Sequence, residues 1–166
     1  MELTDLLPDW QWAALEMELH EGCGMNVHVY NKAGKYVTSY NSWANELCPM
    51  IRSTPQGISA ICSTAQQALT VHAQKTRKAA VSECDAGFAK FLIPIYHGDE
   101  FLGSIGACGY LPTGSEIEYF LLSKTTGKDE AELRQNAAGI KEIRPEEIEK
   151  WIKLFQQSLK EKIPGL

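Results

Sequence analysis

The sequence lacks any run of basic residues. Its formal net charge is −5 at pH 7, whereas a protein that binds nucleic acid needs a basic face to meet the phosphate backbone. No apolar stretch approaches the roughly 18 residues that span a bilayer. The opening stretch MELTDLLPDWQW has no basic region and no apolar core followed by small residues, so we expect no secretory signal. We therefore predict a cytoplasmic domain, or a cytoplasmic segment of a larger receptor, that does not itself bind nucleic acid and has no membrane segment.

Familiar catalytic signatures are missing as well. The chain has no phosphate-binding loop, no His-Glu-x-x-His, no nucleophile elbow and no local signature of a catalytic cysteine. The glycine-rich stretch GSIGACG follows a turn and has the pattern of a strand, whereas a dinucleotide fingerprint lies in a loop before a helix. We therefore expect a protein that is not an enzyme.

The length and the cysteine content predict one reduced domain. A chain of 166 residues can bury a substantial core without covalent staples. Its five cysteines are an odd number, and a chain of this size does not depend on a disulfide framework. We therefore expect free thiols.

Helices are predicted at both ends and in the middle of the chain. Residues 4–20 form the first, with Pro8 early, and a short helical turn follows around residues 44–51. The middle helix starts at Thr54-Pro55, and its buried face carries Ile61, Cys62, Leu69 and His72. The predicted C-terminal helices are, in order, 114–124, 129–139 and 145–162. In the last of them, one apolar stripe is formed by Ile148, Trp151, Ile152, Phe155 and Leu159.

Strands alternate with these helices. Residues 25–41 predict a hairpin that turns at Asn-Lys-Ala-Gly and returns through residues 36–40. Three more strands are predicted at 79–84, 88–97 and 101–111. The order predicts an α+β fold, with a sheet of about five antiparallel strands and helices covering one face.

The middle of the chain resembles a known family on specific residues. The matching features are a cysteine before the helix start Arg-Ser-Thr-Pro-x-Gly, a cysteine inside that helix, and the stretch ECDAGFAKFLIPI. These resemble the PocR ligand-binding (sensory) domain, whose fold is PAS/GAF-like, over a core of about residues 5–112, with a C-terminal helical extension at 113–166. Asp85 stands where members commonly carry a histidine. The resemblance implies a sensor of small organic molecules such as short alcohols and diols, attached to a transcription or signalling output.

Four cysteines lie at the ends of predicted elements, and strand parity and helix periodicity allow them to meet between sheet and helix. They are Cys48, Cys62, Cys84 and Cys108. If they meet, four thiolates suit a zinc ion or an iron–sulfur cluster. None of them forms Cys-x-x-Cys, and free cysteines are also common as small buried hydrophobes, so both interpretations stay open.

An organic ligand is the second possibility for the same region, because ligand pockets have mostly apolar walls and a few polar groups. Candidate wall residues on the strands are Phe91, Ile93 and Ile95, or Leu92 and Tyr96 in the other register. Candidate polar and aromatic partners are His28, Tyr30, Tyr40, Trp43 and Tyr110. Parity places Tyr110 on the same face as Cys108.

Three hypotheses follow. The protein is a sensor of a small organic molecule, a redox or gas sensor with a metal or cluster on the four cysteines, or a structural dimerisation module. The stripe of the last helix covers the sheet or, together with Trp10, Ala13 and Met17, forms a homodimer contact. A sensor would relay its state through the terminal helices to a signalling or transcription partner.

Overall fold

The computed structural model describes residues 1–166 and has one antiparallel sheet at its centre. Its four main strands lie in the order β1-β4-β3-β2, and the two residues of β5 pair in parallel with the end of β4. The strands are β1 (Asn26–Asn31), β2 (Ala80–Glu83), β3 (Ala89–His97), β4 (Glu100–Pro112) and β5 (Glu142–Ile143). The predicted α+β class is confirmed.

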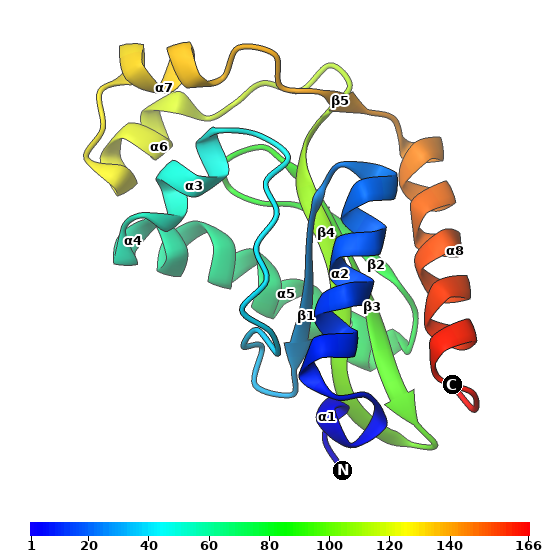
Figure 1. The fold of residues 1–166 in the computed structure, drawn as a ribbon. Coiled ribbons are helices and arrows are strands. Elements are labelled where there is room, and N and C mark those ends of the chain that lie inside the picture. The colour runs from blue at the N-terminus through cyan, green and yellow to red at the C-terminus, as the bar shows by residue number, and fades with distance from the viewer.

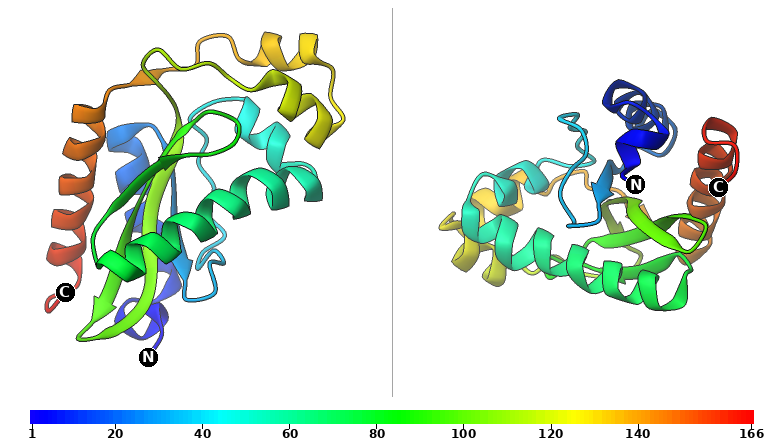
Figure 2. Two further views of the ribbon diagram at one scale, coloured as in Figure 1. Left: turned by 180° about the vertical axis from the view of Figure 1, so that it is seen from behind. Right: turned by 90° about the horizontal axis from the view of Figure 1, so that it is seen from below.

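Helices cover both faces of this sheet, not one face as the sequence suggested (Figure 1). The view along the sheet in Figure 2 shows α2 and α8 on one side and the connected helices from α3 to α5 on the other. The helices are α1 (Leu3–Leu6), α2 (Asp9–Cys23), α3 (Leu47–Arg52), α4 (Pro55–Gly57), η1 (Ile58–Ser63), α5 (Thr64–Thr76), α6 (Tyr119–Thr126), α7 (Glu130–Asn136) and α8 (Pro145–Lys162). None of them combines the length and the apolar character needed to cross a lipid bilayer.

The largest core lies between the sheet and the pair α2–α8. Trp12 and Leu15 of α2 meet the apolar side chains of β1, β3 and β4, and Phe155 of α8 packs edge-on against Phe91, with ring centroids 5.1 Å apart. The stripe on α8 therefore covers the sheet within the chain. Trp10 and Met17, on the outer side of α2, are exposed.

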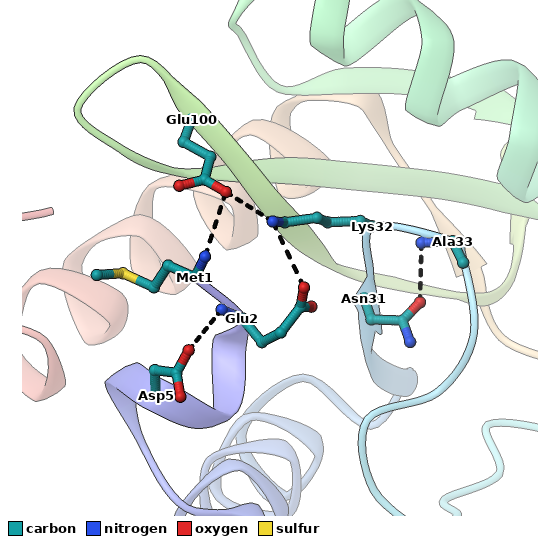
Figure 3. A network of polar contacts seen from close by, with 7 residues as sticks. All are labelled: Met1, Glu2, Asp5, Asn31, Lys32, Ala33 and Glu100. Carbon is teal, nitrogen blue, oxygen red and sulfur yellow. Dashed lines mark hydrogen bonds and ion pairs between the residues drawn. The ribbon is translucent and has the colours of Figure 1, made fainter.

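The N-terminal helix differs from the prediction because of a proline. We expected one helix over residues 4–20, but Pro8 is the N-cap of α2, and Leu7 before it is extended. Proline disfavours helical geometry in the residue that precedes it, so the chain bends there. Figure 3 shows how α1 is held: Lys32 forms ion pairs with Glu2, at 3.5 Å, and with Glu100, at 2.7 Å. These exposed pairs orient the end of the chain and contribute little stability.

The predicted return strand at residues 36–40 is also absent. After the turn, the chain makes a single bridge, between Tyr30 and Tyr36, and β1 pairs along its whole length with β4. The segment 36–40 instead leaves the sheet and leads towards α3.

The middle helix contains a π-helical segment, η1, which changes the buried face that follows it. The buried positions are Gly57, Ile61, Gln66, Leu69 and Ala73, and the step of five residues from 61 to 66 spans the wide turn. A continuous α-helix would have buried His72, as we predicted, but His72 is exposed and Ala73 takes its place. The π-helical segment also turns the side-chain amide of Gln66 to the buried side of the helix, which faces the sheet.

Candidate functional site

A cavity of about 360 Å³ lies between the sheet and the helices α3 to α5, and we call it the site cavity. Of its 22 lining residues, 13 are hydrophobic, so most of the wall is apolar. The lining residues are Asn26, His28, Tyr30, Ala33, Gly34, Lys35, Tyr36, Trp43, Cys48, Ile51, Arg52, Ile58, Ile61, Cys62, Ser63, Ala65, Gln66, Gln67, Cys84, Phe88, Lys90 and Cys108.

The sheet supplies the floor of the site cavity through one face of three strands. Asn26, His28 and Tyr30 alternate along β1, and Asn26 lies opposite Cys108 of β4. On the other side of β4, Cys108 lies opposite Lys90 of β3. Side chains two residues apart on a strand share a face, so these groups all point to the same layer.

The four predicted cysteines all line the site cavity. Cys48 comes from α3, Cys62 from η1, Cys84 from the turn after β2, and Cys108 from β4. Amide groups approach two of the sulfurs, since Asn45 Nδ2 lies 3.4 Å from Cys48 Sγ and Asn26 Nδ2 lies 3.8 Å from Cys108 Sγ.

These thiols are not arranged as a metal site. No group of three or more histidine, cysteine, aspartate or glutamate side chains has a geometry that could hold a metal ion. Burial raises the pKa of Cys48 and Cys62 above the usual range, and it raises the pKa of Cys84 to about 11. These three groups are therefore neutral thiols at physiological pH. All five cysteines of the chain are free.

Three of the predicted ligand-binding residues line the site cavity. His28 is 3% exposed, and its ring stacks on Tyr36 with centroids 4.1 Å apart, while Tyr30 and Trp43 complete this aromatic side of the site cavity. Burial and the charges of Arg52 and Lys90 lower the pKa of His28 to about 3, so the imidazole is neutral. Its Nδ1 atom has no hydrogen-bond partner.

The other predicted contacts lie elsewhere. Phe91, Ile93 and Ile95 point to the opposite face of the sheet and pack in the core beneath α2 and α8. Tyr40 is half-buried outside the cavity lining.

Tyr110 belongs to the opposite core for a local reason. Gly109, with a φ of +110°, sits at a bulge where Ala89 pairs with Tyr110 while Lys90 pairs with Cys108. The extra residue reverses the parity after Cys108, so the expectation that these two side chains share a face was wrong. The hydroxyl of Tyr110 donates instead to the carbonyl of Cys23, at 2.9 Å.

Sequence reasoning missed several polar or aromatic residues of the cavity wall, among them Tyr36, Arg52, Gln66 and Lys90. Lys90 carried a readable signal, because a lysine inside the apolar strand AKFLIPI must be buried or lie at an edge. Gln66 carried none, since its burial depends on the π-helical segment.

The chain is similar to known proteins in two comparisons. The profile of the family described as the sensory domain found in PocR matches residues 5–161. One solved structure, assigned to an ICLR transcriptional regulator from Silicibacter sp. TM1040, aligns with 97% of this chain and 68% of that chain at 15% identity and a TM-score of 0.40. No curated protein sequence matches it.

Proposed function

This chain belongs to the family of sensory domains found in PocR, and on that premise we propose that it senses a small organic molecule bound in the site cavity. The observation that carries the proposal is the cavity itself: about 360 Å³ of space with mostly apolar walls and a few polar groups. This is the usual composition of a small-molecule site. Short alcohols, diols and related compounds are of a size and polarity that suit it.

The strand β3 offers a physical route from ligand to output. Consecutive residues on a strand point to opposite faces, so Lys90 reaches the site cavity while Phe91 packs against Phe155 of α8. A ligand that moves Lys90 therefore acts on the strand that supports α8. We propose that α8 passes this change to a transcription or signalling partner, in a homodimer.

The cysteine content supports a reducing location. All five cysteines are free, and reduced thiols are typical of proteins in the cytoplasm. We therefore propose that the domain is cytoplasmic.

A thermal-shift screen of short alcohols, diols and acids tests the function. Compounds that bind the folded state raise the melting temperature by mass action. The variant Ala65→Phe places a large ring in the site cavity and should lose the response, whereas Ala68→Phe, at an exposed position on the same helix, should keep it. A screen without any active compound, or an Ala65→Phe protein that responds like wild type, would refute the proposal.

A second candidate function rests on the four thiols around one cavity. A zinc ion or an iron–sulfur cluster bound by Cys48, Cys62, Cys84 and Cys108 would make the domain a redox or gas sensor. The amide donors near two of the sulfurs favour this candidate, and the unsuitable geometry and the neutral thiols count against it. Protein purified without oxygen would be brown and contain iron, or would contain one equivalent of zinc, and Cys62→Ser would lose the metal. A colourless, metal-free protein would eliminate this candidate.

A further inference from the structure

Lys90 is a buried cation without an anionic partner. The residue is 5% exposed, and its ammonium group takes part in no hydrogen bond and no ion pair. Its charged group lies 5.4 Å from the centre of the Tyr30 ring. Arg52, half-buried on α3, also lacks an ion pair, and its guanidinium lies 4.8 Å from the centre of the Tyr36 ring. Charged side chains are rarely buried in proteins unless they are paired.

No carboxylate of the cavity wall neutralises this charge. None of the residues that line the site cavity is an aspartate or a glutamate. Burial raises the pKa of the thiols of Cys48, Cys62 and Cys84, so they carry no negative charge that could compensate the two cations. The protein thus surrounds an apolar cavity with uncompensated positive charge.

We propose that the molecule bound in the site cavity is a small organic carboxylate, and that Lys90 and Arg52 hold its carboxylate group. This inference rests on the proposed function and names the chemical class of its ligand. An ammonium and a guanidinium form strong charge-assisted hydrogen bonds with a carboxylate. The apolar walls contact the carbon skeleton of the ligand, and they favour an organic acid over an inorganic anion.

Two unpartnered polar atoms add a further detail. His28 Nδ1 and Gln66 Oε1 are buried at the site cavity and have no hydrogen-bond partner. A hydroxyl group on the ligand would donate to Gln66 Oε1 and accept from His28 Nδ1 in the tautomer that carries its proton there. A short hydroxy acid therefore satisfies more of the cavity than an unsubstituted acid does.

The test compares pairs of compounds that share a skeleton and differ only in carboxylate against alcohol. The pairs are lactate and propane-1,2-diol, propionate and 1-propanol, butyrate and 1-butanol, and benzoate and benzyl alcohol, with inorganic phosphate as a further probe. Calorimetric titrations use wild type, Lys90→Met, and Lys153→Met, which removes an exposed lysine on α8. At least one acid should bind wild type more tightly than its alcohol. Lys90→Met should weaken that acid roughly 10- to 100-fold, the loss expected for one buried charge-assisted hydrogen bond, and Lys153→Met should leave its affinity unchanged.

Several results would overturn the inference. If alcohols or diols bind and their acids do not, the ligand is not a carboxylate, while the proposed function stands. The same holds if phosphate binds without any acid, or if Lys90→Met and Lys153→Met bind the acid equally well. An iron–sulfur cluster in the site cavity would supply the missing negative charge and would also overturn it. If neither acids nor alcohols bind, the inference and the proposed function fail together.

Discussion

Replacing Lys90 by methionine should raise the stability of the ligand-free protein. Methionine keeps the length and the apolar stem of lysine, so the packing of β3 changes little. The substitution removes an ammonium group that has no ion pair or hydrogen bond, on a residue that is 5% exposed. A group kept for ligand binding at the expense of folding stability would behave in this way.

The size of the effect follows from the surroundings of Lys90. Full burial of an unpaired ion costs several kcal/mol, but this ammonium faces a cavity of about 360 Å³ that has room for water. The variant also loses the attraction to the Tyr30 ring, at 5.4 Å, worth about 0.5–1 kcal/mol. We expect a net gain of about 1–2 kcal/mol in the free energy of unfolding, by analogy with the replacement of other buried charges. In a chain of this size the melting temperature would rise by about 2–8 °C.

Urea denaturation of wild type, Lys90→Met and Lys153→Met measures this directly. Lys153 lies on the outer side of α8, exposed and without an ion pair, so its replacement should change the free energy of unfolding by less than about 0.5 kcal/mol. A Lys90→Met protein that is less stable than wild type would refute the reasoning, because it would mean that the folded chain itself compensates the ammonium.

Three further predictions concern the fold around the site. Phe155→Ala should lower the free energy of unfolding by about 3–5 kcal/mol because the ring is fully buried against Phe91. The control Leu154→Ala changes the neighbouring residue, which is 38% exposed, and should lower it by about 1 kcal/mol or less. Similar losses from both variants would contradict this packing. Burial raises the pKa of Glu16 from 4.5 to about 7, so the folded state holds a proton that the unfolded state releases, and this residue should remove about 3 kcal/mol of stability as pH rises from about 4.5 to 7. Urea titrations across this range should show that difference between wild type and Glu16→Gln, and parallel pH profiles would refute it. Gly57→Ala should lower the free energy of unfolding by about 1–3 kcal/mol because the added Cβ would lie 1.9 Å from the carbonyl oxygen of Ile51. Helix propensity alone would give a gain of about 1 kcal/mol instead. A thermal melt that shows this gain would refute the prediction.

Periodicity predicted the elements that depend on one face alone. The predicted bounds 145–162 of the last helix are those of α8, because Pro145 fixes its start and its apolar stripe meets a single surface. The long strands 88–97 and 101–111 were placed within a residue or two for a similar reason. Successive side chains of these two strands point to opposite faces of one sheet, and this alternation makes the strands recognisable in the sequence.

The hydrophobic pattern could not predict which strands pair, nor where a bulge changes the face to which side chains point. The alternation in β1 does not tell whether residues 36–40 or β4 will pair with it, and β4 is the partner. The bulge at Gly109 moves Tyr110 to the other face, and its cause is a left-handed backbone that only the folded pairing reveals. Strand parity and helix periodicity are local, so they could show that the four cysteines may share one layer. The charge beside them comes from Arg52 of α3 and Lys90 of β3, and only the folded chain brings these two together.

The π-helical segment η1 has a consequence for how this chain is compared with its relatives. A π turn holds one residue more than the α turn that it replaces, so it behaves as a single-residue insertion accommodated inside a helix. In an ungapped alignment, a relative without that residue would place, at the positions aligned with Ala65 and His72, the side chains that correspond to Gln66 and Ala73 here. A gap of one residue between residues 58 and 63 restores the correspondence. Without that gap, ligand contacts transferred along α5 would be assigned one position away from the side chains that make them.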